Sequence, residues 1–382
     1  MASGAKSKQR RTAGDPSPLT ERDGGDHRDH RDGLGGRNGQ VGPSDRNGQV
    51  GPPEVEPDDA LADPTAGMVL HRVLAQAART FLLNDMEEEL LDAPSTNGTV
   101  SPLSAPPAGR PLWAQSAFDP SGRSHRRATE VERVHQSRVA LRRIRANLRT
   151  FRLLLDPAWG TSLRAELAWY GGRLGQVRDL HILSDIVTVK GPEVIDPEAI
   201  DRLDSVIGVR IAAALAEVAA ERGGARRFQL NEQMMVLWDG PEFKAKARKP
   251  ASELLPAMLH RSWHDLRGAA RTARKDRTDP NLHKLRIRLK DLRYGCETVA
   301  LVEGGRAKKT ARAAEALQSK LGDLHDAVFA IDWFEELADE YPELREPVDA
   351  LVEIERDAAS VARKGWNREL KEVERRWRAW QG

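Results

Sequence analysis

The stretch VHQSRVALRRIRANLRTF, residues 134–151, joins apolar residues at helical spacing to a run of arginines and contains no acid. Its apolar members, from Val134 to Phe151, recur three or four residues apart, which predicts one buried face of an α-helix. The basic members fall on another face. The stretch therefore predicts an amphipathic helix with an open cationic side, and the question is which anion that side meets.

A second copy of this stretch lies 148 residues further along the chain (283 minus 135). There LHKLRIRLKDLR, residues 282–293, matches VHQSRVALRRIR and again begins its basic pattern with a histidine. Further on, LGQVRD at 174–179 is matched by LGDLHD at 321–326 at nearly the same spacing. Two ordered matches indicate a repeated structural unit, so we expect an internal duplication.

The two copies share the pattern H-x-x-R-x-x-x-[RK]-x-x-R. At about 100° per residue its members fall within about 80° of arc, so they form one narrow stripe of roughly 15 Å on each helix. The stripe residues are His135, Arg138, Arg142, Arg145 and Arg149 in the first copy and His283, Arg286, Lys290 and Arg293 in the second. Like charges at this spacing repel each other, and neither stripe holds an acid of its own.

Two explanations for the stripes are open. In the first, acids from other helices, for example Asp179 and Asp326, which recur with the repeat, pair with the arginines in a structural network. In the second, both stripes face a shared groove that binds a polyanion. The duplication, with a histidine at the head of both stripes, favours the groove.

The rest of the chain predicts an all-α fold. Residues 1–62 are rich in Gly, Pro, Asp, Arg and Asn, which predicts a disordered tail. A single domain is expected over 63–382, with halves at about 63–225 and 250–382 and a Pro-, Ser- and Gly-rich loop inserted at about 93–124. No segment alternates β-branched residues as a strand does. Helices are expected at about 68–91, 129–156, 160–189, 197–222, 251–276, 280–303, 306–340 and 343–380.

Composition limits the classes of function. The 60 basic and 58 acidic residues give a net charge of +2, so an anionic partner must be recruited by local clustering. The single cysteine, Cys296, excludes a disulfide framework and fits a reducing, cytoplasmic setting. No apolar run reaches the ~20 residues of a membrane span, and no apolar stretch follows the basic start, so neither a span nor a signal peptide is expected.

The sequence predicts a protein without catalytic activity. It contains no G-x-x-x-x-G-K-[ST] phosphate loop, no G-x-S-x-G elbow and no C-x-x-C pair. Neither stripe histidine has a second His, Cys or carboxylate three or four residues further along its stripe. Zinc and related metals need several such ligands, so we expect no metal site and no cofactor.

The paired motifs resemble those of a known family. VHQSRVALRRIR, followed by ELAWYGGRLGQVRDLHIL, and LHKLRIRLKDLRY, followed by ALQSKLGDLHDA, are similar to the two halves of a CHAD domain, the conserved histidine α-helical domain. The resemblance runs from about Met68 to the C-terminus. It implies two four-helix units around a basic central channel that binds inorganic polyphosphate, and an association with polyphosphate granules.

The resemblance also implies which residues contact phosphate. Contacts are implied for all the stripe residues and, near the paired Leu-Gly turns, for Arg173, Arg178, Lys320 and His325. The chain departs from the family at Asp291, where a basic residue is usual, and at Glu297, the repeat counterpart of Arg149. The second stripe is therefore expected to be less positive than the first.

The chemistry of polyphosphate fits such a stripe. The polymer offers only oxygen acceptors, and the planar fork of arginine bonds two oxygens while keeping its charge. We further expect His135 and His283 to donate hydrogen bonds to phosphate, with a helix cap or a satisfied polar group as the alternative role. Affinity should then rise on acidification through about pH 6.5.

Two other functions stay open. A nucleic acid also follows a basic groove, but bases stack on aromatic side chains, and Tyr294 is the only obvious one at the stripe edge, with Ala146 as its counterpart. A purely structural or protein-interaction helical domain is the other alternative. In either case the tryptophans are expected in the core, namely Trp159, Trp169, Trp263, Trp366, Trp377 and Trp380.

Overall fold

The computed structural model of the chain describes residues 63–92 and 126–381, and in this part the chain is helical apart from turns and two isolated bridges. The all-α prediction is confirmed. The predicted tail and the predicted insert lie outside the described residues. The α-helices are α1 (Ala66–Asp92), α2 (Arg126–Thr150), α3 (Pro157–Asp185), α4 (Pro197–Arg222), α5 (Ala225–Asp239), α6 (Ala251–Lys275), α7 (Asp279–Glu303), α8 (Gly305–Glu340), α9 (Arg345–Arg363) and α10 (Trp366–Gln381).

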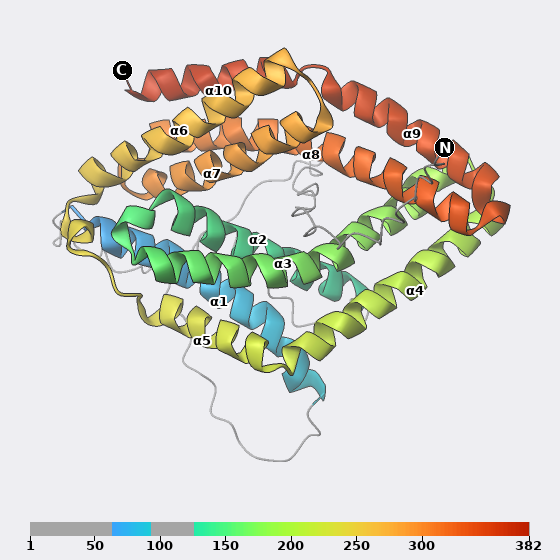
Figure 1. Cartoon of the computed structure of the whole chain (residues 1–382), viewed down its shortest axis with the longest axis horizontal. Helices are drawn as coiled ribbons and strands as arrows, with labels where there is room; N and C mark the ends of the chain where they lie inside the picture. The colour runs from blue at the N-terminus through green and yellow to red at the C-terminus, as the bar shows by residue number, and fades with distance from the viewer. Residues whose placement is uncertain (1–62, 93–125, 382) are drawn as a thin grey trace, which may run out of the picture.

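The helices fall into two halves, α1–α5 and α6–α10, which occupy the lower and upper parts of Figure 1. In both halves consecutive helices pack against each other, the first on the second, the second on the third and the third on the fourth. Helices α2 and α7, which carry the two stripes, pack against each other in the middle of the molecule. Each half of the described chain thus contains five α-helices, where the resemblance implied four.

Two helix predictions are corrected by the structure. The segment between the helices predicted to end at 222 and begin at 251 contains α5, whose Leu230, Met234 and Leu237 are buried at helical spacing. The predicted helix 343–380 is broken into α9 and α10 at Gly365, whose φ of 91° lies in the left-handed region. Glycine adopts this conformation without the steric penalty that a side chain would bring.

One large hydrophobic core contains buried residues from each of the helices α1 to α10. The apolar face predicted for the first stripe helix belongs to it, since Val134, Leu141, Ile144, Leu148 and Phe151 are all buried. The predicted core tryptophans also lie there. Trp366, Trp377 and Trp380 are buried, and Trp159, Trp169 and Trp263 pack against the core while partly exposed.

A second, smaller core lies where α4 and α9 converge, at the right of Figure 1. It combines residues from the end of α3 and from α4 with residues from α8 and α9, so it also joins the two halves. Ion pairs accompany it: Lys190, in the π-helix Ile186–Lys190 that follows α3, pairs with buried Glu355 of α9 at 2.5 Å. Arg210 of α4 pairs with Glu340 of α8.

The contacts between α2 and α7 follow the spacing of the sequence repeat. Arg143 donates to Glu297 at 2.8 Å, and Arg149 donates to Asp291 at 2.9 Å. Position 291 is the repeat counterpart of position 143, and position 297 is that of position 149, because each pair is 148 residues apart. The contact between 143 and 297 is therefore the repeat equivalent of the contact between 149 and 291. Such reciprocity is how two equivalent surfaces meet about a two-fold axis. The common origin of the halves itself stays a prediction.

Candidate functional site

The stripe residues are less open to solvent than the sequence predicted. On α2, Arg138 is only 3% exposed, and on α7, Arg286, Lys290 and Arg293 are between 2% and 9% exposed. Arg142, Arg145 and Arg149 are half-buried, as are His135 and His283. The open cationic side expected for each helix is therefore replaced by largely enclosed cations, because the two stripe helices lie inside the molecule and not on its surface.

Four predicted site residues from α7 and α8 lie close together. The rings of His283 and His325 have centroids 5.0 Å apart, and the charges of Arg286 and Lys290 act on His325. Burial, aided by Arg286 and opposed by Asp326, lowers the pKa of His325 to about 3. His325 is therefore neutral at physiological pH, with the cations Arg286 and Lys290 and the carboxylate of Asp326 acting on it.

Two stripe arginines have carboxylate partners. Nη1 of Arg149 donates to both oxygens of Asp291, at 3.1 and 2.9 Å. Arg293 bonds Glu297 at 2.9 Å and Glu315 at 2.5 Å. For these two residues the structural-network explanation describes what is observed, although the acids are not the ones proposed from the repeat.

Arg145 lies in a group of cations near Asp291, at one end of the α2–α7 contact. Burial, together with the charges of Arg149 and Arg164, lowers the pKa of Arg145 to about 10, and Asp291 opposes the shift. A pKa of about 10 leaves Arg145 charged at neutral pH. Arg164 of α3 was not among the predicted site residues, because it belongs to neither copy of the sequence pattern.

The remaining predicted residues are distributed differently. Arg173 lies toward α4, where it pairs with Glu217 at 3.3 Å and Glu221 at 3.4 Å. Lys320 lies beside Gly365, at the junction of α9 and α10. Arg178 of α3 is buried, with 4% of its surface exposed. Arg173 therefore lies near the C-terminal end of α4, and Lys320 lies near the C-terminal end of α9.

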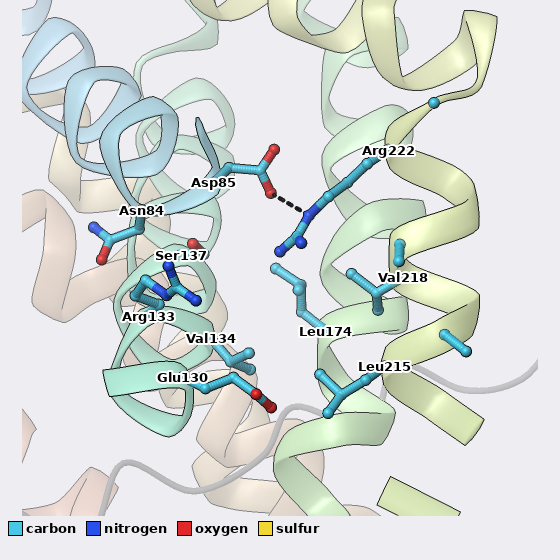
Figure 2. A pocket seen from close by; sticks show the side chains of 13 residues that line it. Asn84, Asp85, Glu130, Arg133, Val134, Ser137, Leu174, Leu215, Val218 and Arg222 are labelled. Carbon is cyan, nitrogen blue, oxygen red and sulfur yellow. Dashed lines mark ion pairs between the residues drawn. The ribbon is translucent and has the colours of Figure 1, made fainter. Parts of the chain in front are cut away.

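A hollow of about 660 Å³ lies among α1, α2, α3 and α4. Figure 2 shows the side chains that line it, with Arg222 reaching toward Asp85. None of the predicted phosphate contacts lines it, and none lines a second hollow of about 350 Å³ between α6 and α7. The stripe helix α2 contributes a different face to the first hollow, through residues such as Arg133 and Ser137.

Asp85 of α1 anchors a buried polar network at the edge of that hollow. It accepts a hydrogen bond from the Tyr170 hydroxyl at 2.8 Å and one from Arg227, which is fully buried. The Arg227 guanidinium also lies over the rings of Phe81 and Tyr170, at 4.7 and 4.5 Å. Burial and the nearby carboxylate raise the pKa of Tyr170. Asp85, Tyr170 and Arg227 thus bond one another inside the protein, which is typical of a structural network.

In residues 63–92 and 126–381, no group of three or more His, Cys, Asp or Glu side chains is arranged to hold a metal ion. None of the helices described there is long and apolar enough to cross a membrane.

Comparisons with known proteins agree with this fold. The structure is similar to PptA from Streptomyces chartreusis, with a TM-score of 0.56 and 20% identity over 81% of this chain and 100% of that one. It is also similar to the crystal structure of the CHAD domain from the plant Ricinus communis, with a TM-score of 0.57 and 18% identity over 82% and 93% of the two chains. A search of the curated proteins finds no match. The family model of the CHAD domain matches residues 121–335, more than half of the sequence, and the chain therefore belongs to the CHAD domain family.

Proposed function

We propose that this protein binds inorganic polyphosphate through the stripes of α2 and α7, without catalysing a reaction. The observation that carries the proposal is that cationic side chains from α2, α3 and α7 gather along both stripes. His325, beside the α7 stripe, and Arg145, on the α2 stripe, both have cationic neighbours that disfavour their protonated forms. Cations held together at a shared helix contact favour an anionic ligand, which relieves their mutual repulsion.

The residue types favour phosphate oxygens over other anions. Arginine predominates, and its fork matches the geometry of phosphate oxygens. The rigid helices hold the donors in a row, which suits a linear polymer of repeated phosphoryl units. The proposal needs no metal and no nucleophile. Association with polyphosphate granules follows from the family and stays a prediction.

A nucleic acid ligand is less well supported by the geometry. Tyr294, the aromatic residue considered for base stacking, is only 2% exposed and lies beside the guanidinium groups of Arg143 and Arg293, at 5.7 and 5.5 Å. A buried ring is not available to an incoming base. Polyphosphate has no bases and needs no such platform.

The test is a calorimetric titration with long-chain polyphosphate at two salt concentrations. The variant carries Arg142→Gln and Arg145→Gln, two half-buried stripe residues. A matched control carries Arg356→Gln and Arg363→Gln, two partly exposed arginines of α9. We expect salt-sensitive binding by the native protein and the control, and binding weakened by about tenfold or more in the stripe variant.

Proton uptake provides a second measurement. A bound polyanion favours the protonated form of His325, so titrations at acidic pH, closer to its pKa of about 3, in buffers of different ionisation enthalpy should reveal protons taken up on binding. Absence of binding by the native protein would overturn the proposal and favour a structural or protein-interaction domain. Displacement of polyphosphate by RNA at equal phosphate concentration would favour the nucleic-acid alternative.

A further inference from the structure

The two ends of the α2–α7 contact differ in their balance of charge. At the Glu297 end, Arg143 and Arg293 bond Glu297, and Arg293 also bonds Glu315, so that two cations meet two carboxylates. At the other end, the charges of the surrounding arginines act on the carboxylate of Asp291. The repeat makes these ends equivalent in position, yet their charges are not equivalent.

Four arginines from three helices act on Asp291. They are Arg145 and Arg149 of α2, Arg164 of α3 and Arg288 of α7. Arg149 holds both carboxylate oxygens, and Nη1 of Arg288 lies 3.7 Å from one of them. One carboxylate therefore faces four guanidinium groups, and this end of the contact has a surplus of positive charge.

Arg164 shows the surplus most directly. Its pKa is lowered by burial and by the charge of Arg149, with Asp291 opposing, and Arg152 adds a further repulsion. Among the described residues its buried Nε has no hydrogen-bond partner. A buried donor of this kind is expensive to leave unsatisfied, so an additional acceptor at this point is favoured.

The same end of the contact adjoins open space. Arg288, whose side chain is 42% exposed, lines the hollow of about 350 Å³ between α6 and α7. Lys284 supplies a second cation to the lining of this hollow. Asp265 is the one acid in its lining, so the lining itself carries more positive than negative charge.

We propose that the polyphosphate site continues past the α2 stripe at the Asp291 end of the α2–α7 contact, in a further phosphate subsite contacted by Arg164 and Arg288. Asp291 holds Arg149 in place and offsets part of the charge until phosphate oxygens arrive. This inference rests on the proposed function, because the ligand is a stretch of the same polyphosphate chain that extends beyond the stripes. The subsite gives long chains an advantage over short ones, since only a long chain reaches the stripes and the subsite at once.

The experiment compares chain lengths. A variant with Arg164→Gln and Arg288→Gln is titrated with long-chain polyphosphate and with tripolyphosphate at several salt concentrations. The control carries Arg312→Gln, which is the repeat counterpart of Arg164 (164 plus 148), and Arg356→Gln. We expect long chains to bind the variant about tenfold more weakly and with a salt slope reduced by about one per arginine removed. Tripolyphosphate should bind the variant as it binds the native protein.

Each other outcome overturns the inference. Unchanged affinity for long chains would show that these arginines only hold the fold, and equal losses for both lengths would place them within the principal site. An equal loss in the control would indicate a general charge effect. If the native protein bound no polyphosphate, both the proposed function and this inference would fail. In the other outcomes the native protein still binds polyphosphate, so only this inference fails. Circular dichroism checks folding, and the single variant Arg288→Gln, at a partly exposed position, replaces the double variant if it unfolds.

Discussion

His325 makes the stability of this protein depend on pH in a way that one substitution removes. Its pKa in the folded protein is about 3, against 6.5 for an unperturbed histidine, because burial and nearby cations such as Arg286 disfavour the imidazolium ion. A folded pKa below the unfolded one means that the unfolded chain binds the proton first. The stability is therefore complete above about pH 6.5 and is lost progressively as the pH falls toward 3.

The magnitude follows from the two pKa values. Between about pH 7.5 and about pH 5 the unfolded chain takes up nearly one proton at this position while the folded protein takes up almost none, which lowers the free energy of unfolding by about 2 kcal/mol. Replacing His325 by Asn removes this contribution. The native protein should thus lose about 2 kcal/mol more than His325→Asn over this range.

The assay is urea unfolding of the ligand-free native protein and the variant at both pH values, followed by circular dichroism. Taking the difference between the two proteins cancels the titration of the other groups. His264→Asn on α6 is the matched control at an exposed histidine, since the His264 side chain is 81% exposed. If the native protein and His325→Asn lost equal stability within about 0.5 kcal/mol, the positive and buried environment assigned to His325 would be wrong.

Two further predictions concern the helix contacts. Gly295→Ala should lower the free energy of unfolding by about 1–3 kcal/mol, because a Cβ there would lie 2.5 Å from Cδ2 of Leu259 in the core. Gly160→Ala, whose Cβ would have nothing within 4 Å, should be neutral or stabilising by up to about 1 kcal/mol. Equal effects of the two substitutions in urea unfolding would refute the packing argument. Arg227→Ala should cost about 3–5 kcal/mol because it removes the fully buried partner of Asp85 and leaves that carboxylate with only the more distant Arg222 as a cation. Its neighbour Arg226→Ala, half exposed, should cost less than about 1 kcal/mol. Similar losses for the two neighbours would contradict the burial of Arg227.

The sequence predicts the helical content and the buried face of α2 because both depend on local spacing. Apolar residues at three- and four-residue intervals leave few alternatives to a helix with one buried side. The break at Gly365 was missed because its cause is a backbone angle, and the flanking helices α9 and α10 share a continuous helical pattern. Helix α5 did carry a readable signal in Leu230, Met234 and Leu237, and recognising it needs only the same periodicity.

The electrostatics of the site were less predictable, because they depend on which helices meet. No local pattern indicates that Arg164 of α3 joins Arg145 and Arg149, or that Arg227 is enclosed with Asp85. The enclosure of Arg138 and Arg286 also follows from tertiary packing, since each helix alone would leave its cationic side in water. The repeat predicted which residues form the stripes, and the packing determined how much of each stripe remains accessible.

The repeat also explains the two residues that depart from the family pattern. Because positions 143 and 297 meet, and positions 149 and 291 meet, two identical copies would place arginine against arginine at both contacts. In this chain the first copy keeps Arg143 and Arg149, and the second carries Asp291 and Glu297 at the equivalent positions. Each copy is thereby repelled by itself and attracted by the other, so the charges favour pairing within one chain over pairing of α2 with α2, or α7 with α7, between chains. The acids at positions 291 and 297 thus allow the two cationic helices to lie side by side.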